Sequence, residues 1–136
     1  FSSYFFNSLL TSFFFFSIDR QTLSQGHTKA VSGCDWSSDG SCLVSCSDEV
    51  LNVWDSSTFK VIQSLQQQSK ISSCGFLPKD SSAVLYGSWK QLNLWRYHSG
   101  SPQSCPEASI VSSIATHSNY IASASHDSTV KLWQLT

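Results

Sequence analysis

The side chains that could carry out chemistry in this sequence are four histidines, five cysteines and several aspartates at turns. Zinc sites combine closely spaced cysteine and histidine ligands, but no CxxC motif occurs and the cysteine count is odd. Nucleophilic catalysis needs a Ser-His-Asp arrangement or a nucleophile elbow, and phosphate binding needs a glycine-rich loop. None of these patterns is present. The sequence therefore predicts no metal site, no cofactor, no small-molecule ligand and no enzymatic activity.

The cysteines and aspartates instead follow a repeat. Cys34 and Cys74 occupy equivalent positions and alternate with serines, which is typical of small core-facing strand residues in a reducing compartment. Asp39, Asp48 and Asp127 stand at turns of the repeat. We interpret all of them as structural.

The repeat itself has a spacing of 40 residues. Residues 31–34 (VSGC) recur at 71–74 (ISSC) and at 111–114 (VSSI). About twenty residues after each copy, an apolar run ends in Trp54, Trp95 or Trp133. A period near 40 predicts a repeat architecture of stacked units rather than a single irregular core.

Each repeat predicts a blade of short antiparallel strands joined by polar turns, and four such strands in about 40 residues form one blade of a β-propeller. We expect strands in the first repeat at 31–36, 42–47, 50–54 and 60–65. The second predicts strands at 71–76, 83–87 and 92–95, with a weakly marked fourth within 96–104. The third predicts strands at 110–115, 120–125 and 129–133 and no fourth strand.

The expected fold is therefore all-β, with three four-stranded antiparallel blades of which the last is incomplete. Propellers have about 4–8 blades, so we expect a fragment of a larger ring. The absence of methionine agrees with a fragment. The expected boundaries are residues 21–66 for blade 1, 67–105 for a degenerate blade 2 and 106–136 for blade 3, which lacks its fourth strand.

Residues 1–20 form a separate, phenylalanine-rich segment, uncharged as far as residue 18. No basic region precedes it, as a signal peptide would require, and polar residues interrupt it too often for a membrane span. We interpret the segment as non-native or disordered, with residues 1–18 as a translated intron end. A membrane anchor and a diverged strand of a preceding repeat are the alternatives.

Charge limits the partners. With 8 basic and 9 acidic side chains, the chain has no excess of positive charge to bind nucleic acid or a membrane surface. The repeat architecture indicates instead a scaffold that binds other proteins.

Residues 26–27 (GH), 54–55 (WD) and 125–133 (SHDSTVKLW) resemble the WD40-repeat family over about residues 21–136. Within it, the segments GHTKAVSGCDWSSDG, YGSWKQLNLW and IASASHDSTVKLW are similar to the C-terminal WD40 region of LEUNIG-type plant transcriptional corepressors, relatives of the Groucho class. The resemblance implies a non-catalytic nuclear scaffold that binds adaptor proteins, DNA-bound transcription factors or repression machinery. A cytoplasmic substrate-recognition or assembly subunit, as in a ubiquitin ligase, and a non-functional truncated product are the alternatives.

The resemblance also implies a hydrogen-bonded network of a histidine, a strand serine, a turn aspartate and a strand tryptophan. In blade 1 these fall on His27, Ser45, Asp48 and Trp54, with Glu49 as an alternative to Asp48. Blade 3 keeps Ser123, Asp127 and Trp133 but has Glu107 at the histidine position, so its network is incomplete or differently built. Blade 2 keeps Trp95 alone, because Gln67, Tyr86 and Trp89 replace the others, and should depend on packing.

Trp89 is the strongest candidate for protein binding. It aligns with the turn position of Asp48, at the tip of a turn beside Lys90, and exposed tryptophans are typical of interface hot spots. The alternative is that Trp89 folds back into the space left by the missing network. Lys29, Lys70 and His126 lie on turns that should share its face, or are merely solvated turn residues.

Overall fold

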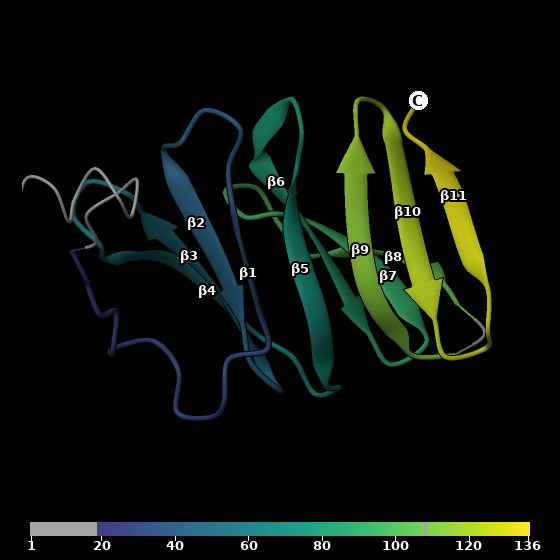
Figure 1. Cartoon of the computed structure of the whole chain (residues 1–136), viewed down its shortest axis with the longest axis horizontal. Helices are drawn as coiled ribbons and strands as arrows, with labels where there is room; N and C mark the ends of the chain where they lie inside the picture. The colour runs from purple at the N-terminus through teal and green to yellow at the C-terminus, as the bar shows by residue number, and fades with distance from the viewer. Residues whose placement is uncertain (1–18, 108) are drawn as a thin grey trace, which may run out of the picture.

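The computed structural model describes residues 19–107 and 109–136, and within them it contains strands and turns but no helix. Three antiparallel sheets stand side by side (Figure 1). They have four, four and three strands, which confirms the all-β fold expected from the repeat. The phenylalanine-rich residues 1–18 lie outside the described residues. No described helix is long and apolar enough to cross a membrane.

Each sheet is a meander in which consecutive strands pair. Blade 1 contains β1 (Gly33–Trp36), β2 (Cys42–Cys46), β3 (Val50–Asp55) and β4 (Val61–Gln66). Blade 2 contains β5 (Ile71–Leu77), β6 (Asp80–Ser88), β7 (Gln91–Arg96) and β8 (Gln103–Pro106). Blade 3 contains β9 (Val111–His117), β10 (Tyr120–Ser125) and β11 (Val130–Gln134).

Aspartates fix the turns between strands. Asp39 Oδ1 accepts hydrogen bonds from the Ser37 hydroxyl at 2.7 Å and from the Ser41 main-chain N–H at 3.0 Å. Asp55 Oδ1 accepts from the Ser57 main-chain N–H at 2.8 Å, and hydrogen bonds from Ser57 and Thr58 lower the pKa of Asp55 to about 2. An aspartate that accepts hydrogen bonds from the main chain of its own turn stabilises the turn conformation. The role of these aspartates is therefore structural.

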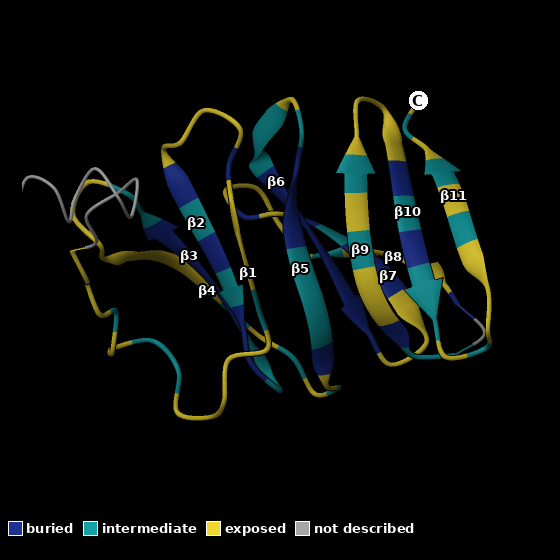
Figure 2. Ribbon diagram, in the orientation of Figure 1, coloured by how far each residue is buried: buried dark blue, intermediate teal, exposed yellow. Residues whose placement is uncertain are grey.

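The core lies between the blades, because side chains alternate along each strand and both faces of blade 2 are covered. On β6, Val84 and Tyr86 pack against blade 1. Their neighbours Ala83 and Leu85 pack against blade 3. Figure 2 shows the resulting pattern, with buried residues concentrated in the strands and exposed ones in the turns and outer strands.

The first strands β1, β5 and β9 are neighbours in space and carry the contacts between blades (Figure 1). The main-chain N–H of Phe76 donates to Asp35 Oδ2 at 3.0 Å, which joins blade 2 to blade 1. Gly87 lies so close to blade 3 that a Cβ atom there would come within 2.7 Å of Val111 Cγ1. Glycine at this position therefore permits the close approach of the two sheets.

The outward faces of blades 1 and 3 have no neighbouring sheet among the described residues. Val130 and Leu132 of β11 are 70% and 76% exposed, and Trp36 of β1 is 54% exposed. Cys34 is also exposed, so the expectation that it faces the core is wrong. The physical reason is that its repeat equivalent Cys74 packs against blade 1, whereas no described sheet precedes blade 1 to cover Cys34.

Candidate functional site

Turns from all three blades gather at one end of the sheets, at the lower edge of Figure 1. Main-chain hydrogen bonds join them: Ile71 N–H donates to Asp48 O at 2.8 Å, and His126 N–H donates to Ile110 O at 3.0 Å. A third bond runs from Glu107 N–H to Lys90 O at 2.8 Å. We call this end the turn face, formed by residues 26–32, 47–49, 67–70, 88–90, 109–110 and 126–129.

Beneath the turn face, blade 1 contains a hydrogen-bonded network. The Trp54 indole N–H donates to Ser45 Oγ at 2.8 Å, and Ser45 Oγ lies 2.6 Å from His27 Nε2. The other ring nitrogen, Nδ1, lies 3.1 Å from Ser47 Oγ. The structure thus brings together three of the four residues expected in this network.

The donors determine the tautomer of His27. Ser45 Oγ accepts from the Trp54 indole, and His27 Nε2 lies 3.4 Å from the Asn52 amide nitrogen Nδ2, which can only donate. Nε2 is therefore an acceptor, and the Ser45 hydroxyl donates to it. The proton of the neutral ring is therefore on Nδ1, which donates to Ser47. Desolvation by burial lowers the pKa of His27 below its usual value of 6.5, because a charged ring would lose water there.

Asp48 lies outside this network. Its carboxylate faces Lys70 at 3.7 Å, while Glu49 faces Lys29 at 3.5 Å. Both pairs are well exposed, so each contributes little to stability. Ser47 takes the place that the sequence suggested for the aspartate. The Ser47 side chain is buried beside His27 Nδ1, whereas the Asp48 side chain is 47% exposed.

Blade 3 has a network built differently, around the buried Glu107. Trp133 Nε1 donates to Ser123 Oγ at 2.9 Å, and the Ser123 hydroxyl donates to Glu107 Oε1, also at 2.9 Å. Lys131 donates to the second oxygen of Glu107 and lies 3.5 Å from Asp127 Oδ2. The hydrogen bond to Glu107 raises the pKa of Lys131. Asp127 thus joins the network only through Lys131.

Blade 2 combines packing with a third arrangement. Tyr86 replaces the strand serine and is fully buried against blade 1. In the same core cluster, Trp95 lies edge-on to Tyr97, with their ring centroids 6.0 Å apart. In addition, Asn93 donates to Ser88 Oγ at 3.0 Å and accepts from Ser104 Oγ at 2.6 Å. The blade that keeps only the tryptophan therefore still has a buried polar network.

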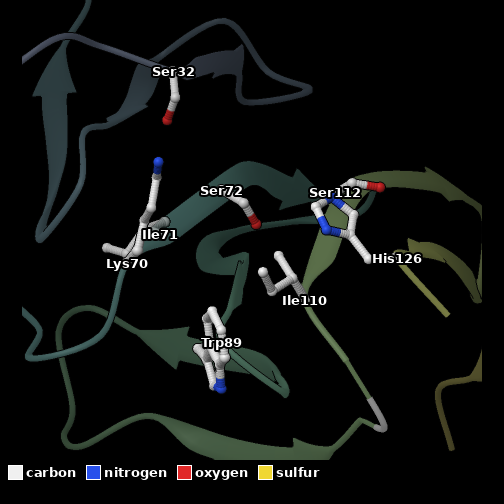
Figure 3. Close-up of a pocket in the computed structure, with 8 residues that line it drawn as sticks. All are labelled: Ser32, Lys70, Ile71, Ser72, Trp89, Ile110, Ser112 and His126. Carbon is white, nitrogen blue, oxygen red and sulfur yellow. The ribbon is translucent and has the colours of Figure 1, made fainter.

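The turn face contains a pocket of about 340 Å³ that touches all three blades (Figure 3). It brings together three of the five expected binding residues, Lys70, Trp89 and His126. Trp89 is 56% exposed, so it does not fold back into the core. Lys29 and Lys90 are exposed on the same face but do not line the pocket.

The remaining lining residues were not identified from the sequence. They are Ser32, Ile71, Ser72, Ile110 and Ser112. The signal for the serines was present, because Ser32, Ser72 and Ser112 stand 40 residues apart at the second position of each repeat. Equivalent positions in adjacent blades lie near one another, so the repeat spacing alone would have placed them together.

All five cysteines are free thiols. Cys46 and Cys74 lie at the interface of blades 1 and 2, where their interaction lowers the pKa of Cys46 and, together with burial, raises the pKa of Cys74. Within residues 19–107 and 109–136, no three His, Cys, Asp or Glu side chains are grouped so that they could hold a metal ion.

Comparison with known proteins agrees with the architecture. The chain is 26% identical over 121 residues to the transcriptional corepressor LEUNIG_HOMOLOG of Arabidopsis thaliana, a match that covers 85% of this chain and 15% of the relative. The chain thus corresponds to about 15% of the length of that protein. The family described as WD domain, G-beta repeat matches residues 19–55 and 100–134, more than half of the chain. The chain therefore belongs to the WD40-repeat family.

Proposed function

We propose that this chain is the protein-binding propeller part of a transcriptional corepressor in the nucleus. WD40 repeats mediate protein–protein interactions and are typically non-catalytic scaffolds. The observation that carries the finer proposal is the similarity to a transcriptional corepressor over 85% of the chain. Its partners would be adaptors of DNA-bound transcription factors or components of the repression machinery, and it would not contact nucleic acid itself.

The turn face supplies the binding residues in this proposal. Trp89 offers a large exposed aromatic surface. Lys70 and His126 line the pocket with it, and Lys29 and Lys90 are exposed on the same face. Tryptophan anchors with polar surroundings are common at the centres of protein interfaces. The networks of blades 1 and 3 lie below these turns and hold them in place, which makes them supporting rather than contacting residues.

A tethered reporter assay tests the corepressor proposal. The natural protein that carries this chain would be fused to a heterologous DNA-binding domain and directed to a reporter gene. We expect reduced transcription with the wild type and with the control Lys79→Ala, which lies on the β5–β6 turn at the opposite end of the sheets. Trp89→Ala should restore transcription. No repression by the wild type would refute the corepressor function.

A further inference from the structure

Three serines at equivalent positions of the repeats, Ser32, Ser72 and Ser112, line the pocket on the turn face. The hydroxyls of Ser32, Ser72 and Ser112 each lie within hydrogen-bond distance of a main-chain carbonyl on the second strand of their own blade. The distances are 3.4 Å to Cys46 O, 3.2 Å to Gly87 O and 3.2 Å to Ala124 O. Their protons are therefore used within the protein. These serines therefore offer few hydrogen-bond donors to a ligand.

Apolar side chains form much of the wall. Ile110 and the exposed indole of Trp89 face the pocket (Figure 3), and Ile71 lies behind its surface, fully buried. The volume of about 340 Å³ falls at the lower end of the usual range for ligand sites, about 300–1,000 Å³. Such a wall favours a large apolar side chain over a polar one.

The ionisable side chains that line the pocket are basic. The lining contains Lys70 and His126 but no carboxylate. Figure 3 shows Lys70 on one side of the pocket and His126 on the other. Lys70 also faces Asp48, but at 3.7 Å and with side chains 70% and 47% exposed, so this pair is weakly held. A ligand carboxylate in direct contact with the ammonium group would compete with it.

We propose that this pocket binds a short acidic segment of a partner protein. One large apolar side chain of the segment packs against Ile110 and Trp89, and a neighbouring aspartate or glutamate pairs with Lys70, assisted by His126. This inference rests on the proposed function, because it names the chemistry of the partner that the turn face recognises.

The test uses a blocked pentapeptide in which a central leucine is flanked by two aspartates on each side, titrated into the natural protein. Binding would be followed by the NMR signals of the Trp89 indole and the His126 ring. We expect saturable shifts at both residues, at least tenfold weaker binding when lysines replace the aspartates, and a similar loss when serine replaces the leucine. Binding should also weaken as salt is added.

Two variants separate charge from fold. Lys70→Glu should weaken binding of the acidic peptide at least tenfold and improve binding of the lysine peptide, whereas the matched control Lys79→Glu should change neither. Both side chains are exposed, so neither variant should unfold the blade. Equal affinity for the acidic and basic peptides, or unchanged binding by Lys70→Glu, would overturn the proposal.

The outcome is distinguishable from that of the reporter assay. Repression that depends on Trp89 together with no preference for the acidic peptide would overturn this inference and leave the corepressor function standing. Selective binding of the acidic peptide without any repression would support the inference and refute the corepressor function.

Discussion

The Ser123 hydroxyl donates a 2.9 Å hydrogen bond to Oε1 of Glu107, in the place where Ser45 donates to Nε2 of His27 in blade 1. In both blades the serine accepts from a tryptophan indole and passes its own proton to a half-buried or buried acceptor. The residue that faces the serine hydroxyl must therefore be a hydrogen-bond acceptor, but it need not be a histidine. A carboxylate meets that requirement when a cation such as Lys131 offsets its burial.

Glu107→Ala should destabilise blade 3. The change leaves the buried Ser123 hydroxyl without its acceptor, which we expect to lower the free energy of unfolding by about 1–3 kcal/mol. Glu107→Gln keeps an acceptor oxygen and should cost less. Urea denaturation of the natural protein would measure both. The matched control Glu49→Ala removes an exposed carboxylate and should change stability by less than about 1 kcal/mol. Equal effects of the two alanine variants would contradict the role given to Glu107.

Protonation of His27 should weaken the fold. Burial lowers the pKa of His27 below 6.5 in the folded state, so the unfolded chain binds the proton more readily. The free energy of unfolding should therefore fall as the pH drops below about 6.5, and level off below the folded pKa. NMR titration of the His27 ring, with urea denaturation at each pH, would test this. A His27 pKa at or above 6.5 would contradict the destabilising effect of burial on the charged ring.

The outer face of blade 3 should cause self-association of residues 19–136 produced alone. Val130 and Leu132 are largely exposed on β11 and offer apolar surface that burial would stabilise. We expect the sedimentation coefficient to rise with protein concentration. Combining Val130→Lys with Leu132→Lys should abolish that rise, whereas two lysines placed at the exposed Ser57 and Thr58 should not. Concentration-independent sedimentation of the wild type would refute the prediction.

Much of the fold could be predicted from the sequence, because three copies of one pattern reinforce each other. The tryptophan-ending strands lie where expected, at β3, β7 and β11. The fourth strand of blade 2 was weakly marked, and β8 (Gln103–Pro106) extends past the expected limit of residue 104. All four residues of β8 are exposed, so burial imposes no alternation of apolar and polar residues that a pattern could reveal.

The site was less predictable than the fold, because turn lengths differ between repeats. The shorter turn of blade 1 moves Asp48 to solvent and lets Ser47 complete the His27 network, which similarity of position alone does not indicate. The role of Lys131 depends on Glu107, which lies 24 residues away and meets it only through the pairing of strands. The position of Trp89 at a turn tip was predictable because it is set locally, whereas the sequence left open whether its side chain folds back or is exposed, as the structure shows it to be.

The central claim is that the turn face binds other proteins. The most direct measurement is quantitative affinity purification from the native source, comparing the wild type with the combined variant Trp89→Ala and Lys70→Glu and with the opposite-end control Lys79→Glu. We predict that proteins recovered equally with the wild type and the control are depleted at least tenfold with the turn-face variant. Identical recovery with all three proteins would contradict the claim.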